Sequence, residues 1–236
     1  MRIECPSETH LLAPIRVEEF YPLEDMEQDG HKTLIVMSWL LGSTNDLHAS
    51  LTGELLAGVL LEDSASPLQQ ALETSDLGTA PSPLCGLDNS NKEMTFICGL
   101  EGCTADDTQA IEALIISTLE GIVKNGVPQE SIDAVLHQLE MEQREIGGGS
   151  YPYGLQLILD ALTTAVHYGD ALAALNLTPV LEQLRSDIKD PQFIQKLIQT
   201  QLLDNPHRIR LSLKPDGQFA ARRDAAEAAR LAQIKA

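Results

Sequence analysis

The chain has 236 residues, of which 43% are hydrophobic and only 4% aromatic, so it can bury one sizeable core built from Leu, Ile, Val and Ala. Its 35 acidic and 16 basic residues give a formal net charge of −19, and no basic run is longer than Arg222-Arg223. Such a field repels phosphate, so we expect no nucleic-acid or membrane partner; a soluble surface is the favoured explanation, ahead of an acidic cavity for basic peptides.

The first third of the chain predicts two strands followed by two helices. The strands, at residues 16–21 and 33–41, are separated by an acidic, glycine-containing turn, so we expect them to be neighbours in a sheet. Leucines spaced four residues apart predict a helix from Leu47. Ser66-Pro67 then opens a second helix, which we expect to close at Gly78.

A strand and a long amphipathic helix follow. From Lys92 to Gly102 every second side chain is apolar, and the preceding turn-forming run at residues 88–91 predicts a hairpin arm with one buried side. Thr104 then caps a helix that ends at Gly126. Its apolar stripe consists of Ile111, Leu114, Ile115, Leu119, Ile122 and Val123.

The remainder of the chain predicts mainly helices. Pro128 starts a helix that Gly147-Gly148-Gly149 stops, and its apolar stripe contains Ile132, Val135, Leu136, Leu139 and Ile146. Further helices are predicted at residues 155–166, from Pro179, and from Asp190-Pro191 to Asn205-Pro206. The last two elements are a strand at 208–214, with Ile209, Leu211 and Leu213 expected to face the core, and a charged, alanine-rich helix at 220–235.

This order of elements, with strands and helices in separate groups, predicts an α+β fold rather than alternating βαβ units. We expect a mainly antiparallel sheet packed against helices, with an extra helical part toward the C-terminus. No repeat or low-complexity linker divides the chain, so residues 1–219 are expected to form one domain and residues 220–236 the start of a protruding helix.

The cysteines and the N-terminal sequence bear on metal binding and location. Cys5, Cys85, Cys98 and Cys103 form no C-x-x-C pair, so a structural zinc site is not expected and the thiols are expected to be free. Residues 1–6 have no apolar core of a signal peptide, and no eighteen uncharged apolar residues occur in succession. We therefore expect a cytoplasmic, reducing location.

His137-Gln138-Leu139-Glu140-Met141 is the nearest approach to a metal-binding motif. The inverted zinc motif H-x-x-E-H places two imidazoles on one helical face and uses the carboxylate as a base, but Met141 stands where the second histidine is needed. One imidazole and one carboxylate do not supply the three protein ligands of a catalytic zinc, so we expect His137 to be solvated beside Glu130, Asp133 and Glu140. An independent metalloenzyme using His137 and Glu140 is the disfavoured alternative.

The other histidines and the loop sequences predict no chemistry. His167 closes a helix, where an imidazolium suits the carboxyl end of the dipole, and chance placement accounts for His10, His31, His48 and His207. G-x-S-x-G, G-x-G-x-x-G and G-x-x-x-x-G-K-[ST] are all missing from the sequence. We therefore predict no catalytic, metal-ligating or cofactor-binding residue.

Several segments from about Leu51 onward resemble the second domain of the presequence-protease branch of the pitrilysin and insulysin superfamily of zinc metallopeptidases. The first two are residues 60–78, similar to the family's helix pair, and 88–100, similar to its hairpin. The most specific are Ser150-Tyr151-Pro152-Tyr153-Gly154-Leu155, His167-Tyr168-Gly169-Asp170 and Leu202-Leu203-Asp204-Asn205-Pro206-His207-Arg208. Together the segments cover most of the chain.

This resemblance implies a non-catalytic domain, a fragment of a clamshell enzyme of four related domains that encloses and cuts peptides. Zinc is then held by the parent's first domain, and no family catalytic or zinc residue transfers to this sequence. Residues 220–235 resemble the beginning of the family's linker hairpin. The implied partners are the remaining domains and the parent's peptide substrate, and in isolation a homodimer is expected because covered apolar surface becomes exposed. The alternative is a stand-alone structural homologue acting as a subunit of a larger complex.

Overall fold

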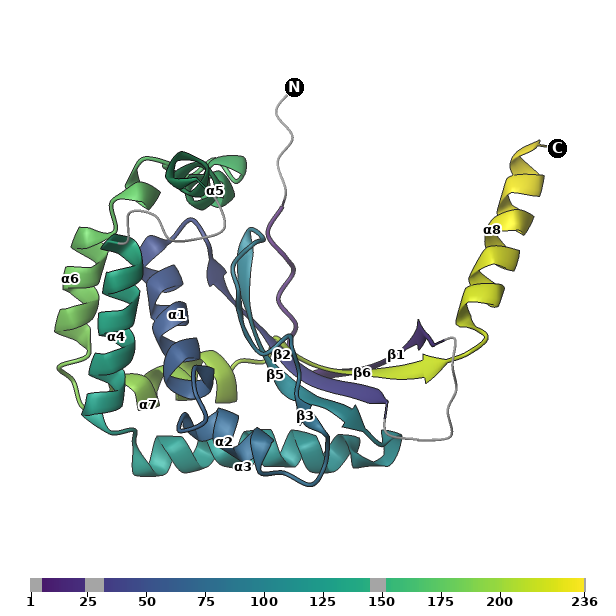
Figure 1. The fold of residues 1–236 in the computed structure, drawn as a ribbon, viewed down its shortest axis with the longest axis horizontal. Coiled ribbons are helices and arrows are strands. Elements are labelled where there is room, and N and C mark those ends of the chain that lie inside the picture. The colour runs from purple at the N-terminus through teal and green to yellow at the C-terminus, as the bar shows by residue number, and fades with distance from the viewer. Residues whose placement is uncertain (1–5, 24–31, 145–151, 236) are drawn as a thin grey trace.

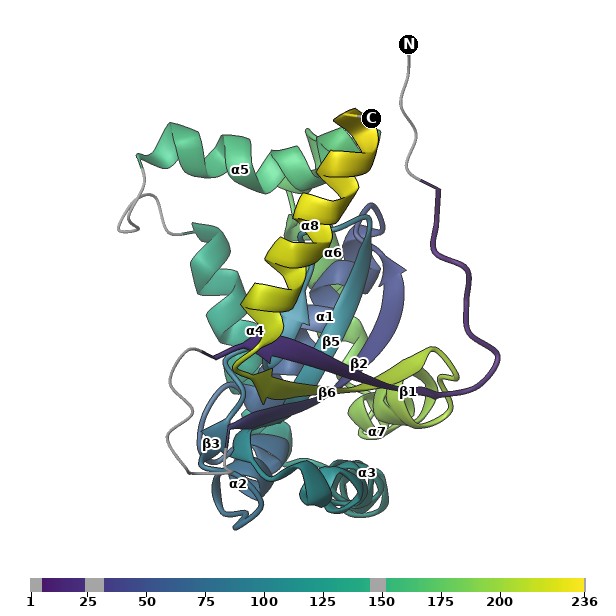
Figure 2. The same ribbon diagram turned by 90° about the vertical axis from the view of Figure 1, so that its right-hand side faces the viewer.

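The computed structural model describes residues 6–23, 32–144 and 152–235. In these ranges a six-stranded sheet is covered on one face by helices, and the last helix projects away from the rest (Figures 1 and 2). The strand order is β1-β6-β2-β5-β3, with β4 paired to β5, and every pairing is antiparallel except β1 with β6. The predicted α+β class with a mainly antiparallel sheet is confirmed.

Most elements expected from the sequence are present, with small shifts at their ends. The strands are β1 (Ile15–Pro22), β2 (Thr33–Ser43), β3 (Ala80–Pro81), β4 (Gly86–Asp88), β5 (Glu93–Cys103) and β6 (Arg208–Asp216). The longer helices are α1 (Leu47–Leu61), α3 (Thr108–Asn125), α4 (Gln129–Arg144), α5 (Tyr153–Val166), α6 (Thr178–Asp187) and α8 (Phe219–Lys235). The shorter ones are α2 (Pro67–Glu73), η1 (Ala105–Asp107), η2 (Ala173–Leu175), α7 (Phe193–Leu197) and η3 (Ile198–Leu203).

The core is built around α1, in whose second half every residue from Leu55 to Leu60 is buried. It contacts β2, β4 and β5 of the sheet and is also contacted by α2, α4 and α6. Gly58 allows α4 to approach closely, because a Cβ at that position would lie 2.5 Å from Val135 Cγ1. A helix that is apolar all round is stable only when it is enclosed, and these neighbours enclose it.

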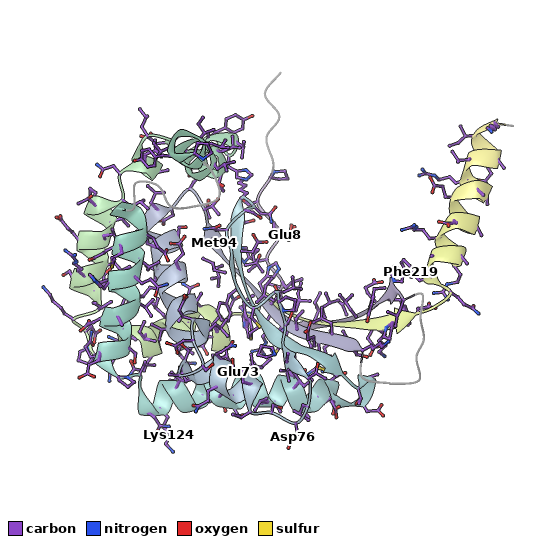
Figure 3. The ribbon with its side chains drawn as sticks, viewed as in Figure 1. Glu8, Glu73, Asp76, Met94, Lys124 and Phe219 are labelled. Atoms are coloured by element: carbon purple, nitrogen blue, oxygen red, sulfur yellow. The ribbon has the colours of Figure 1, made fainter. Side chains whose placement is uncertain are left out.

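One face of β2 and β5 supplies the sheet's part of the core. Its buried side chains are Ile35, Met37 and Trp39 on β2, and Met94, Phe96, Cys98 and Leu100 on β5, as the alternation predicted for β5. The Trp39 and Phe96 rings lie 5.9 Å apart, and Trp39 Nε1 donates to Leu202 O at 2.8 Å. Figure 3 shows Met94 on the side of β5 that faces α1.

The expectation that the first two strands are neighbours is wrong, because β6 lies between β1 and β2. Val36 of β2 pairs with Leu211 of β6, and Leu211 pairs on its other side with Val17 of β1. The strand β1 is largely exposed, with charged residues such as Glu18, and such a strand suits the edge of a sheet rather than its interior. The more apolar β6 therefore takes the inner place.

The expected orientation of β6 is also wrong. Its fully buried residue is Ser212, which pairs with Ile35 on the face that the helices cover, whereas Ile209, Leu211 and Leu213 lie half-buried on the other face. The predicted alternation of apolar and polar residues is present, but the apolar residues face away from the helices and the polar ones face toward them. On this face Arg210 has a partner on α3, whereas the buried Ser212 hydroxyl has none among the described residues.

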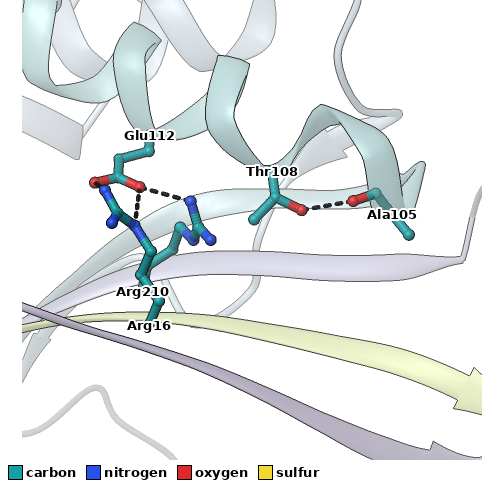
Figure 4. Close-up of polar contacts among 5 residues, drawn as sticks. All are labelled: Arg16, Ala105, Thr108, Glu112 and Arg210. Atoms are coloured by element: carbon teal, nitrogen blue, oxygen red, sulfur yellow. Dashed lines mark hydrogen bonds and ion pairs between the residues drawn. The ribbon is translucent and has the colours of Figure 1, made fainter.

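Glu112 of α3 provides such a partner for β6 (Figure 4). Its carboxylate accepts hydrogen bonds from Arg210 Nη1 at 2.6 Å and from Arg16 Nη2 at 3.0 Å. Burial would raise the pKa of Glu112, but the hydrogen bonds and charges of the two guanidinium groups outweigh it and leave the pKa lowered. This cluster joins α3 to β6 and β1, where the apolar cover ends.

The ends of three predicted helices can be compared with the structure. Gly126, at φ +78°, ends α3 as expected, since the left-handed region favours glycine. The helix α2 ends at Glu73 rather than at Gly78, because the following residues turn back so that Thr79 N donates to Glu101 O of β5. The expected stop of the α4 helix, with Ile146 and Gly147-Gly148-Gly149, lies outside the described residues.

Across the described ranges, no helix combines the length and the apolar character that a bilayer crossing needs.

Two glycine-to-alanine changes test the packing of the sheet. A Cβ at Gly99 would lie 2.1 Å from Ile35 O and 2.6 Å from Val36 Cα, so Gly99→Ala forces β5 away from β2 and should cost about 3 kcal/mol or more. Gly121 lies within α3, and a methyl group added there would meet nothing within 4 Å, so Gly121→Ala should be neutral or stabilise by up to about 1 kcal/mol. Urea unfolding measures both, and equal effects would contradict the packing described.

Candidate functional site

The helix α5 carries the largest run of exposed apolar side chains. It crosses the end of the helical layer, near the amino-terminal end of α1 (Figures 1 and 2). Ile158 is 62% exposed, and the residues after the helix continue the surface to Leu172, which is 78% exposed. The α5 face is defined here as Tyr153, Leu155, Ile158, Leu159, Leu162, Val166, Tyr168, Leu172 and Leu175. A contiguous apolar surface of this kind is typical of an interaction site.

The turn after α5 attaches it to α1. Asn45, just before α1, donates from Nδ2 to His167 O at 2.9 Å, and Gly169 N donates to Thr164 O at 2.9 Å. A Cβ on Gly169 would lie 2.4 Å from Asn45 Oδ1, so only glycine allows this approach. Tyr168 has a φ of +62°, a left-handed conformation that this compact turn requires.

A cavity of about 260 Å³ lies beneath α5, between α1, η2 and the turn that follows β4. The polar part of its wall consists of Thr44, Ser50, Glu54, Asn89, Thr163 and Thr164. Leu47, Leu51, Leu159, Ala174 and Leu177 complete the lining. No sequence pattern indicates this cavity, because its walls come from three regions, 44–54, 89 and 159–177, that are far apart along the chain.

Glu54 is the ionisable residue of the cavity. Its pKa is raised to about 7, chiefly by burial and also by the nearby carboxylate of Glu142 on α4, although a hydrogen bond from Asn89 Nδ2 to Oε1 at 3.1 Å acts to lower it. Among the described residues no cation pairs with Glu54. The cavity therefore holds a largely buried carboxylate whose negative charge is stabilised by one neutral hydrogen-bond donor, the Asn89 amide, and not by a cation.

The HQLEM segment lies on α4 and does not form a metal site. His137 is exposed, as expected, and Met141 is 57% exposed. Glu140 points the other way: it is buried, at 7% exposure, and pairs with Arg185 of α6. The expected place of Glu140 beside a solvated His137 is therefore wrong, because its carboxylate is used to join α4 to α6.

The remaining histidines are less isolated than the sequence indicated. His48 Nε2 lies 2.8 Å from Asp187 Oδ2 of α6, a partner 139 residues away along the chain. His207 is buried, its Nδ1 accepts from Leu11 N at 3.3 Å, and its ring makes an edge contact with His10. His167 is the C-cap of α5, as predicted. His31 lies outside the described residues.

Within the described ranges, no group of three or more His, Cys, Asp or Glu side chains is arranged to hold a metal ion. Cys85, Cys98 and Cys103 are free, and burial raises the pKa of each thiol. Cys5 is outside the described part of the chain. The residues present therefore do not fit a catalytic zinc, which needs three protein ligands and an open position.

Residues 12–139 match the family model described as the peptidase M16 inactive domain. Among curated proteins, the mitochondrial presequence protease of Yarrowia lipolytica is 31% identical over 203 residues, which are 85% of this chain and 20% of that protein. The chain thus spans about one fifth of the length of such relatives.

Solved structures show the same fold. A peptidase M16 inactive domain from Pseudomonas fluorescens gives a TM-score of 0.57 at 15% identity, covering 92% of this chain and 46% of that chain. An inactive peptidase domain from Bordetella parapertussis gives a TM-score of 0.58 at 14% identity, covering 81% of this chain and 95% of that chain. The second comparison indicates that a chain of about one such domain can be folded and crystallised.

Replacing Glu54 by glutamine should stabilise the protein in a pH-dependent way. Because the pKa of Glu54 is about 7 when folded and near 4.5 when unfolded, the carboxylate destabilises the fold as pH rises through this interval. Glu54→Gln should raise the free energy of unfolding by up to about 3 kcal/mol near pH 8 and change it little near pH 5. Thermal and urea unfolding at both pH values measure this.

The matched control is Glu120→Gln, which removes the same charge from an exposed position on α3. For this variant, the difference between the free energies of unfolding at the two pH values should be the same as for the parent chain. A Glu54→Gln variant that is less stable than the parent near pH 8 would contradict the assigned burial of this carboxylate.

Proposed function

This chain belongs to the family of peptidase M16 inactive domains, and on that premise we propose that it is a non-catalytic structural domain of a larger, peptide-degrading zinc metallopeptidase. Its partners are then the other domains of the same polypeptide, together with the peptide that those domains enclose. The catalytic zinc would be held by the parent's first domain. In this role the domain forms part of the wall of the proteolytic chamber.

The observation that carries this proposal is the use made of the HQLEM segment. A catalytic H-x-x-E-H helix keeps its carboxylate free to act on a metal-bound water. Here Glu140 is buried in an ion pair with Arg185, and Met141 replaces the second histidine. The one segment with a likeness to a zinc site is therefore part of the packing between α4 and α6.

Two apolar surfaces support a role beside other domains. One is the α5 face, and the other is the half-buried sheet face that carries Ile209, Leu211 and Leu213 on β6. Domains of one polypeptide meet through surfaces of this kind.

A second candidate is a stand-alone non-catalytic homologue that acts as a subunit of a larger complex. The Bordetella parapertussis chain, which is covered to 95%, is described as the inactive domain of a proposed zinc protease and so fits the first candidate better. The two candidates differ in whether the partner surfaces lie on the same polypeptide or on another one. Free thiols at Cys98 and Cys103 are compatible with a reducing compartment such as the cytoplasm for either.

The purified chain should not cleave peptides. We expect no proteolysis of an unstructured peptide by mass spectrometry, with or without added zinc, because three protein ligands for the metal are not brought together in the described residues. A His137→Ala variant should behave identically. Peptide cleavage that a chelator abolishes, or stoichiometric zinc in the purified protein, would overturn the proposal.

In isolation the chain should self-associate through the α5 face. Sedimentation equilibrium is expected to give a mass above the 25.7 kDa of one chain, because exposed leucine and isoleucine side chains leave water on association. The double variant Ile158→Glu and Leu162→Glu should be monomeric. Leu12→Glu, at a residue 97% exposed and far from α5 in the sequence, is the control and should not change the mass. A monomeric parent chain would count against this surface.

A further inference from the structure

The cavity beneath α5 has a chemical character that a purely structural role does not require. An apolar filling would be more stable there than a carboxylate, since an uncompensated buried charge opposes folding. Glu54 nevertheless lies in the wall, opposite α5, with Asn89 as its hydrogen-bond donor. A carboxylate that lowers the stability of the folded chain is a candidate for binding a ligand.

We propose that this cavity binds the ammonium or guanidinium group of a lysine or arginine side chain that a peptide presents. This activity goes beyond the structural role, because it gives the domain a contact of its own with a peptide.

The polar atoms of the wall favour a cation as the ligand. Glu54 keeps one carboxylate oxygen free of the Asn89 hydrogen bond, and the Asn89 amide oxygen remains an acceptor. The hydroxyl groups of Ser50 and Thr163 can also accept hydrogen bonds. A ligand carboxylate or phosphate would instead meet the like charges of Glu54 and Glu142, which makes an anion an unsuitable occupant.

The size of the cavity favours one side chain rather than a whole small molecule. Pockets for drug-sized ligands have volumes of about 300–1,000 Å³, and this cavity has about 260 Å³. The alkyl part of a lysine or arginine side chain would contact Leu51 and Leu177 while its charged end reaches Glu54. The remainder of the peptide would then lie outside the cavity.

The surface beside the cavity suits the rest of such a peptide. Leu159 of α5 lines the cavity and is 40% exposed, so it can contact the peptide residue next to the bound side chain. The net charge of −19 attracts basic peptides at long range. A peptide with one basic residue between apolar residues would match both features.

The test is isothermal titration of the chain with the peptide acetyl-Leu-Ala-Arg-Leu-Ala-Leu-amide and with the same peptide carrying citrulline in place of arginine. Citrulline keeps the shape of arginine without its charge. Near pH 8 we expect saturable binding of the arginine peptide and an affinity for the citrulline peptide that is lower by about 10-fold or more. Lowering the pH to about 6 should weaken binding, because Glu54 becomes protonated whereas arginine stays charged. Apart from Glu54, the lining side chains are neutral, and Glu142 is the other carboxylate that acts on Glu54.

Two variants locate the binding. Glu54→Gln should lower the affinity for the arginine peptide by about 10-fold or more, so that the arginine and citrulline peptides bind equally. Glu120→Gln should leave the affinity for the arginine peptide unchanged. Because Glu54→Gln is expected to fold at least as well as the parent chain, lost binding would not reflect unfolding. No saturable binding, equal binding of the two peptides, or equal losses in both variants would each overturn the proposal. None of these outcomes depends on whether the domain is catalytic.

Discussion

The second half of α1 is apolar all round and has to be enclosed, and this constraint shapes the rest of the fold. The core face of β2 and β5 covers one side, while α2, α4 and α6 cover the others. The enclosure is tight, since Gly58 of α1 leaves no room for a Cβ against Val135 of α4. Burial of this single helix therefore explains why the helices collect on one face of the sheet.

Two of the buried carboxylates lie where the apolar cover ends, and each pairs with arginine from another element. Glu112 of α3 joins Arg210 and Arg16 across β6 and β1, and Glu140 joins α4 to Arg185 of α6. Glu54 differs from these two carboxylates, because in the described part of the chain its hydrogen-bond donor is the neutral amide of Asn89. The contrast between compensated and uncompensated carboxylates separates the groups that hold the fold together from the one that is available for a ligand.

Local patterns predicted the elements well and their mutual placement less well. The alternation in β5 and the apolar stripe and Gly126 of α3 identify both elements, because each depends on neighbours a few residues away. The insertion of β6 between β1 and β2, and its orientation, depend on Glu112 and on residues far along the chain. The partners of His48 and Glu140, and the cavity around Glu54, were unpredictable for the same reason: each joins segments whose proximity exists only after folding.

The central strand β2 also constrains the time at which the protein can fold. Trp39 Nε1 bonds to Leu202, 163 residues later in the chain, and Leu40 O accepts from Asn205 Nδ2, 165 residues later. On the ribosome, one edge of β2 must therefore remain unpaired until most of the domain has been synthesised. Contacts of such long range slow folding, and an apolar strand with an open edge attracts other chains in the meantime.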